Sequence, residues 1–172
     1  MTNIALAIDS VEVQQVEDSQ RDLYLTFRLH GEDYGIAINY VTEIIGIQKI
    51  TNIPDMPTYI KGVINLRGRV IPVMDVRLRF GLPYRDYDER TCVIVVEINE
   101  LTTGLVVDRV KEVVEITTDQ IEPAPNNNAE GSYIEGMGKI GEEVKILLNI
   151  ESLISLDKEV MSDVNQIEEL VE

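Results

Sequence analysis

Apolar and polar residues alternate along most of this chain, with the period of two that is typical of half-buried β-strands. The apolar members of the first such segment are Leu23, Leu25, Phe27 and Leu29. Further segments of this kind span residues 34–38, 47–53, 61–66, 92–98, 102–107 and 144–150, and a bent one spans residues 110–116. Because these segments are short and separated by turn residues, the pattern predicts a mainly β fold, with sandwich and barrel equally compatible.

Two short helices interrupt this pattern. Asn39 is a candidate N-cap for a helix over residues 40–45, which Gly46 would end. Asp75 is a candidate cap for a helical turn that runs to Phe80. The segment 92–98 is apolar on both faces, which predicts a strand covered on both sides.

The chain divides by composition into a polar lead-in, a central domain and a tail. Residues 1–19 are polar and acidic, and the charged connector 84–90 separates predicted barrel halves at roughly 20–83 and 90–157, which could exchange a terminal strand or helix. The tail, residues 158–172, carries one apolar face of an amphipathic helix, formed by Val160, Val164, Ile167 and Val171. Such a helix packs on its own domain, frays or docks on a partner.

The segment from Gly62 to Asp75 predicts a tight hairpin. With Arg67 and Gly68 as its loop, the facing pairs are Leu66–Arg69, Asn65–Val70 and Ile64–Ile71. Gly68 can adopt the positive φ that such a turn needs, and Pro72, which lacks an N–H, belongs near the strand end or on an edge. The turn presents the Arg67 guanidinium either as a solvated charge or as a donor to a partner's carboxylate.

Charge and cysteine content restrict the function classes. The chain has 172 residues, with 31 acidic and 15 basic side chains and a formal net charge of -16. Such a chain repels phosphate backbones and anionic lipid, so we expect no nucleic acid as a partner and no direct membrane insertion. The N-terminus does not have the pattern of a signal peptide, and the single cysteine, Cys92, forms no internal disulfide. We therefore expect a cytoplasmic protein.

Residues suited to catalysis or to metal binding are few. The single histidine, His30, lies at a predicted turn, and Cys92 lies in an apolar strand. The acidic stretch 86–89 lacks the spacing and the glycine of a calcium loop. Residues 136–141 match GxGxxG, but no strand precedes them and no helix follows, as a dinucleotide site would require. The sequence predicts a non-enzymatic protein without cofactor or metal, and a small β-barrel enzyme or ligand-binding module is the alternative.

The stretch GVINLRGRVIPVMDV, residues 62–76, resembles the signature of the CheW family, the adaptors of bacterial chemotaxis arrays. Further segments similar to that family lie at 23–29, 34–36, 41–44, 105–110 and 121–125. The resemblance covers about residues 20–157. It implies two five-stranded SH3-like β-barrels that share a hydrophobic interface, with short helices and a C-terminal helix.

The resemblance also implies a function without catalysis. Members of this family couple chemoreceptors, the methyl-accepting chemotaxis proteins, to the histidine kinase CheA. The implied partners are the CheA regulatory domain and the cytoplasmic signalling tip of a receptor, with the protein a monomer outside the array. A CheW-like adaptor of another kinase–receptor system, such as one for type IV pili, would have the same sequence features.

The resemblance also implies that the receptor's helical hairpin binds in the apolar groove between the two barrels. The corresponding positions in this sequence are Val41, Glu43, Arg67, Cys92, Val93, Val110 and Val113. For Val93, Val110 and Val113, ordinary core packing is the alternative interpretation. At the kinase contact, Asn126 and Asn127 stand where many relatives have a hydrophobic residue, which predicts a weaker or more polar ring-closing contact.

Overall fold

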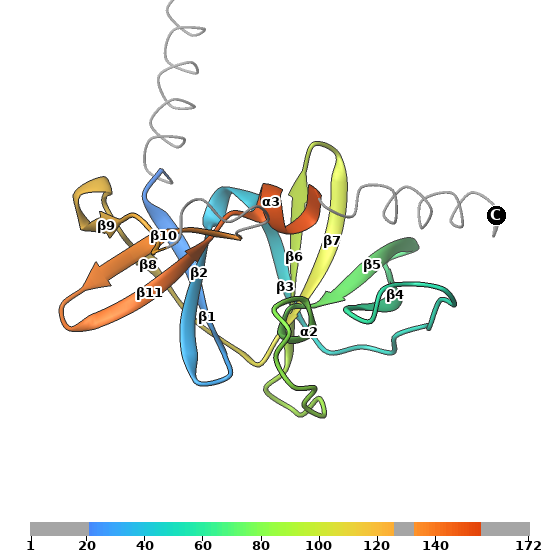
Figure 1. Cartoon of the computed structure of the whole chain (residues 1–172). Helices are drawn as coiled ribbons and strands as arrows, with labels where there is room; N and C mark the ends of the chain where they lie inside the picture. The colour runs from blue at the N-terminus through green and yellow to red at the C-terminus, as the bar shows by residue number, and fades with distance from the viewer. Residues whose placement is uncertain (1–20, 126–132, 156–172) are drawn as a thin grey trace, which may run out of the picture.

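The computed structural model describes residues 21–125 and 133–155, which form two β-sheets on a shared core (Figure 1). The six-stranded sheet has the order β8-β1-β2-β11-β10-β9. Its strands are β1 (Leu23–Leu29), β2 (Glu32–Ala37), β8 (Arg109–Glu115), β9 (Ile121–Glu122), β10 (Ile134–Ile140) and β11 (Glu143–Leu148). The prediction of a mainly β protein is confirmed.

The five-stranded sheet has the order β3-β6-β7-β5-β4. Its strands are β3 (Val41–Gly46), β4 (Ile60–Leu66), β5 (Arg69–Asp75), β6 (Cys92–Ile98) and β7 (Leu101–Val107). The helical segments are the 3₁₀ turns η1 (Ile38–Tyr40) and η2 (Thr118–Gln120) and the short helices α2 (Val76–Arg79) and α3 (Ile150–Ser155). The lead-in 1–19, the tail 158–172, Asn126 and Asn127 lie outside the described residues.

The sheets do not correspond to the consecutive halves 20–83 and 90–157. The five-stranded sheet uses one continuous stretch of chain, from β3 to β7, and crosses the connector 84–90. The six-stranded sheet combines β1 and β2 with the strands from β8 onward, because β1 pairs with both β2 and β8. β2 in turn pairs in parallel with β11, where Tyr34 lies opposite Ile146. The first strands therefore complete a sheet made mostly by the end of the domain.

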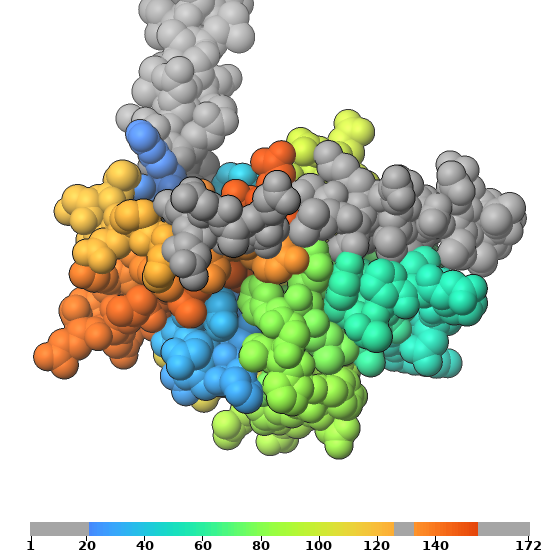
Figure 2. Space-filling view, in the orientation of Figure 1, coloured from blue at the N-terminus to red at the C-terminus, as the bar shows by residue number. Residues whose placement is uncertain are grey.

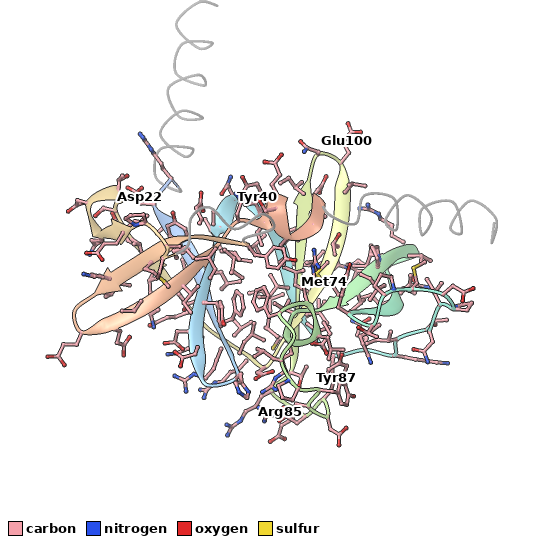
Figure 3. All side chains as sticks on the ribbon, viewed as in Figure 1. Asp22, Tyr40, Met74, Arg85, Tyr87 and Glu100 are labelled. Atoms are coloured by element: carbon pink, nitrogen blue, oxygen red, sulfur yellow. The ribbon has the colours of Figure 1, made fainter. Side chains whose placement is uncertain are left out.

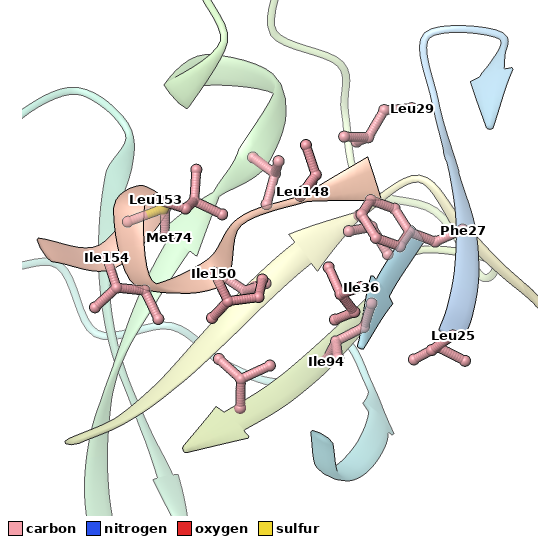
Figure 4. Packing of buried hydrophobic residues seen from close by; sticks show 14 of the residues in the cluster. Leu25, Phe27, Leu29, Ile36, Met74, Ile94, Leu148, Ile150, Leu153 and Ile154 are labelled. Atoms are coloured by element: carbon pink, nitrogen blue, oxygen red, sulfur yellow. The ribbon is translucent and has the colours of Figure 1, made fainter. Parts of the chain in front are cut away.

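A hydrophobic core joins the two sheets (Figure 4). It contains Leu25, Phe27 and Leu29 of β1, Ile94 and Val96 of β6, and Ile150, Leu153 and Ile154 of α3. A second core lies against the other face of β6 and contains Val93 and Val95. Alternate β6 side chains thus enter different cores, which confirms the prediction of a strand covered on both sides.

The hairpin β4–β5 has the predicted register. Leu66 pairs with Arg69, and Gly68 and Arg67 adopt positive φ values of 87° and 52°. The Asn65 side-chain oxygen accepts a hydrogen bond of 2.8 Å from the Gly68 N–H. Pro72 lies in the middle of β5, not at its end, but β7 pairs with β5 only from Val73 onward. The missing N–H therefore falls in a stretch of β5 that β7 does not reach.

The predicted helix over residues 40–45 is wrong. Asn39 lies inside the 3₁₀ turn η1, and Val41–Gly46 is strand β3, paired with β6. Alternating burial along β3 and its pairing with β6 outweigh the capping preference of Asn39. The predicted strand 47–53 is also absent, since only Thr51 forms a bridge there, opposite Val63. By contrast, Asp75 caps α2 as predicted, accepting from the Leu78 N–H at 3.3 Å.

The GxGxxG segment belongs mainly to a strand. Gly136 and Gly138 lie within β10, and Gly141 occupies the following turn with a φ of 60°. A Cβ at Gly138 would lie 3.0 Å from the Ile116 side chain, and one at Gly136 would lie 2.8 Å from Ile121. These glycines therefore allow close packing inside the six-stranded sheet.

Candidate functional site

Two of the predicted site residues contact each other directly. Arg67, at the tip of the β4–β5 hairpin, donates to both carboxylate oxygens of Glu43 on β3, at 3.2 and 2.7 Å. Because β3 and β4 are the outer strands of the five-stranded sheet, this ion pair links the sheet's two edges. We call Glu43 and Arg67 the edge pair. The carboxylate expected on a partner is thus already present within the chain.

The edge pair is accessible. The Arg67 side chain is 76% exposed and that of Glu43 is 24% exposed. A guanidinium has five N–H donors in a rigid fork that matches a carboxylate, and two of those of Arg67 donate to Glu43. An exposed pair of this kind contributes only about 0–1 kcal/mol to stability, so it can exchange partners.

Three of the predicted apolar site residues lie along the shared core but not side by side, because Val41 pairs with Val96 at one end of the β3–β6 ladder and Cys92 pairs with Gly46 at the other. Val41 of β3, Cys92 of β6 and Val110 of β8 are half-buried and pack against the shared core. Val113 of β8 is 48% exposed. Val93 has no exposed surface and belongs to the second core, so no partner can touch it in this conformation and its core interpretation holds.

The sequence prediction missed one apolar residue of this surface. Ile44 on β3 is 44% exposed; it follows Glu43 along the strand and so points to the opposite face, the face of its partner Ile94 in the shared core. The sequence prediction assigned residues 40–45 to a helix, and helical periodicity places Ile44 on a different face from the one that strand periodicity gives it. Figure 2 shows the outer contour of the molecule, with the β10–β11 hairpin at one end and the segment before β4 at the other.

The charged connector 84–90 is held by specific contacts (Figure 3). The Tyr87 hydroxyl donates to Asp75 at 2.7 Å, and Arg85 forms an ion pair with Asp88 at 2.9 Å. Burial, together with this hydrogen bond to a carboxylate, raises the pKa of Tyr87 far above its usual value. The connector is therefore anchored to the five-stranded sheet near α2.

Chemistry beyond ion pairing is sparse in the described ranges. Within residues 21–125 and 133–155, no three or more His, Cys, Asp or Glu side chains form a group that could hold a metal ion. The Cys92 thiol lies 3.3 Å from the Arg90 carbonyl oxygen. In the same part of the chain, no helix has the length and apolar character needed to cross a bilayer.

These features define a two-sheet β protein. An exposed ion pair joins the two edge strands of its five-stranded sheet, and exposed or half-buried apolar side chains lie on the edge strands and beside the shared core. A family profile described as CheW-like domain matches residues 23–158. The chain belongs to the CheW-like family, whose members include chemotaxis scaffold proteins.

Individual relatives agree with this assignment. The chain is 41% identical to the chemotaxis protein CheW of Klebsiella aerogenes, over 81% of this chain and 86% of that protein. It is 33% identical to CheW of Bacillus subtilis, over 78% of this chain and 86% of that protein. The crystal structure of the scaffolding protein TtCheW from Thermoanaerobacter tengcongensis aligns with a TM-score of 0.72 at 36% identity, covering 77% and 92% of the two chains.

Proposed function

We propose that this protein couples chemoreceptors to the histidine kinase CheA as a non-enzymatic adaptor in the cytoplasm. The observation that carries the proposal is the edge pair, at the positions where the family resemblance places receptor-binding residues, in a chain that belongs to the CheW-like family. The protein would bind the regulatory domain of CheA and the cytoplasmic signalling tip of a receptor, and would be a monomer outside the array.

The proposed receptor surface combines apolar anchors with a charged rim. Val41, Cys92 and Val110 lie half-buried along the shared core, so a helical partner could complete their burial. Val113 and the newly identified Ile44 add exposed apolar area. Apolar anchors of this kind supply most of the affinity, while rim charges fix orientation. Val93 is not part of this surface, because it is fully buried in the second core on the other face of β6.

The edge pair would set the orientation of the receptor. A carboxylate or carbonyl oxygen on the receptor tip would compete with Glu43 for the Arg67 guanidinium. Since an exposed pair is worth at most about 1 kcal/mol, that exchange opposes binding only weakly. The adaptor then acts by geometry: a receptor conformation that binds it better shifts the equilibrium of the attached kinase.

The kinase-facing surface remains a prediction on Asn126 and Asn127, which lie outside the described residues. If these amides make the contact weak or polar, Asn127→Phe should raise affinity for the CheA regulatory domain. An unchanged affinity would count against the assignment of this loop.

Binding measurements on the purified protein test the proposal. Wild type, Arg67→Ala and Arg67→Glu are titrated with the CheA regulatory domain and with a receptor cytoplasmic fragment. Arg69→Ala is the matched control, because Arg69 is exposed on the same hairpin but donates to Thr102 at 3.2 Å. We expect the Arg67 variants to lose receptor affinity about tenfold or more, with kinase affinity and thermal stability retained. We expect Arg69→Ala to bind like wild type.

Each contrary result has a distinct meaning. If folded wild type binds neither partner, the chemotaxis assignment fails and an adaptor for another kinase–receptor system becomes the next hypothesis. If the Arg67 variants unfold while Arg69→Ala does not, the edge pair is structural. If Arg67 and Arg69 variants lose affinity equally, the effect comes from the net charge of the hairpin.

A further inference from the structure

Asp108 occupies the single position between β7 and β8. β7 ends at Val107 in the five-stranded sheet, and β8 begins at Arg109 in the six-stranded sheet. Figure 1 shows this crossing at the end of the molecule where α2 and the β1–β2 turn also lie. A side chain at this position can therefore contact elements of both sheets.

The contacts of Asp108 come from both sheets. Arg77 of α2, which directly follows β5, donates to the two Asp108 oxygens at 2.6 and 2.8 Å. The backbone N–H of His30, in the β1–β2 turn, donates to the same carboxylate at 3.0 Å. A second cation, Arg85 of the connector, lies 3.7 Å away. One carboxylate thus joins the five-stranded sheet, the six-stranded sheet and the connector.

This cluster is largely removed from solvent. The side chains of Arg77 and Asp108 are 10% and 11% exposed. Burial alone would raise the pKa of Asp108, but the hydrogen bonds from Arg77 and the His30 backbone outweigh burial and lower it. Asp108 is therefore a carboxylate held in its charged form by fixed donors on either side of the sheet junction.

We propose that Asp108 is a positioning residue that fixes the orientation of the two sheets relative to each other. In doing so it sets the placement of Val110 on β8 relative to Cys92 on β6, which pairs with Val107 just before Asp108, and to that extent the inference rests on the proposed receptor surface. The apolar core between the sheets supplies attraction without direction. A bidentate ion pair adds a preferred geometry, which is the best-supported use of buried charge pairs.

Asp33 provides a matched control. Its side chain is 12% exposed, close to the value for Asp108, and it also pairs with several cations. Those cations are Arg28, Lys111 and Lys145, which all belong to the six-stranded sheet. Asp33→Asn therefore removes a comparable carboxylate without touching a contact between the sheets. Because it also leaves the buried Lys145 ammonium without its main counter-charge, the variants are compared at a temperature where circular dichroism shows both to be fully folded.

The direct test measures the relative position of the sheets by electron paramagnetic resonance. Spin labels are placed at Glu97 of β6 and Glu135 of β10, two exposed positions on different sheets, in full-length protein with Cys92 replaced by Val. We expect Asp108→Asn to broaden or shift the distance distribution and Asp33→Asn to leave it unchanged. An unchanged distribution in Asp108→Asn, or equal broadening in both variants, would overturn the proposal.

A second variant keeps the test decisive if Asp108→Asn does not fold. Arg77→Lys retains the charge but loses the planar fork, so it should also broaden the distribution, by a smaller amount. A distribution identical to that of wild type in Arg77→Lys would then contradict the positioning role.

Receptor binding is measured on the unlabelled proteins with Cys92 intact. We expect Asp108→Asn to lose roughly 2- to 30-fold in affinity for the receptor fragment, the usual size of such indirect couplings, and Asp33→Asn to bind like wild type. If wild type does not bind the fragment, the proposed function fails, while the distance distributions still decide the role of Asp108. Unaltered affinity in an Asp108→Asn protein with a shifted distribution would refute the link to the receptor surface.

Discussion

The ion cluster around Lys145 makes an asymmetric prediction about stability. The Lys145 side chain is 2% exposed, and its ammonium donates to Asp33 at 2.7 Å. Its second partner, Glu143 at 3.1 Å, is 69% exposed. Asp33 has two further cations, Lys111 at 2.9 Å and Arg28 at 3.2 Å. The carboxylate therefore has alternative partners, whereas the buried ammonium depends mainly on Asp33.

Removing either partner should have unequal costs. Asp33→Asn leaves a buried ammonium without its main counter-charge, so we expect it to lower the free energy of unfolding by about 3–5 kcal/mol. Lys145→Met removes the buried charge, fills a similar volume and leaves Asp33 paired, so we expect a loss of at most about 2 kcal/mol. Urea denaturation at pH 7, followed by far-ultraviolet circular dichroism, measures both.

The same cluster predicts a dependence on acid. Burial works against the Asp33 charge, but the hydrogen bonds from Lys145, Lys111 and Arg28 outweigh it and hold the pKa far below its usual value. A group whose pKa is lower in the folded state stabilises the protein at pH values above its unfolded-state pKa. This contribution is lost as the pH falls toward the folded-state pKa. The difference between wild type and Asp33→Asn should therefore shrink below about pH 4. Equal costs for the two variants at pH 7, or a difference independent of pH, would refute this reasoning.

Packing and the connector give two further predictions. A Cβ at Gly104 would lie 2.7 Å from the Val93 side chain, so Gly104→Ala should lower the free energy of unfolding by about 1–3 kcal/mol. A Cβ at Gly46 would have no atom within 4 Å, so Gly46→Ala should change it by less than about 0.5 kcal/mol. Equal melting temperatures for the two variants would contradict this. Tyr87→Phe removes the hydroxyl that donates to the buried Asp75, so urea denaturation should show a free energy of unfolding lower by about 1–3 kcal/mol. An unchanged midpoint would mean that this hydrogen bond does not anchor the connector.

Features set by neighbouring residues were predictable from the sequence. The β4–β5 register follows from the two-residue turn at Arg67 and Gly68, because hairpin loop length determines which residues face each other. The Asp75 cap of α2 depends on a contact only three residues away. Both predictions are confirmed because the interaction that decides each structure is local.

Features that depend on distant strands were not predictable in the same way. Asn39 has a capping preference, but the pairing of β3 with β6, about 50 residues later, makes residues 41–46 a strand. In β11, alternation made Val144 appear buried and Lys145 exposed, yet Val144 is 49% exposed and Lys145 is 1% exposed. Because β11 contacts apolar side chains on both faces, alternation alone could not tell which face would contain the charge.

Arg67 shows how such a long-range contact changes the meaning of a residue. From the sequence it was either a solvated turn charge or a donor to a partner, because its internal partner is 24 residues away on the opposite edge of the sheet. The structure combines the two interpretations: the side chain is 76% exposed and still forms a bidentate pair. Such a pair holds the guanidinium in a defined direction while contributing little to folding. A receptor carboxylate would then meet an Arg67 that is already oriented and needs to displace only Glu43, so this residue can determine binding without determining the fold.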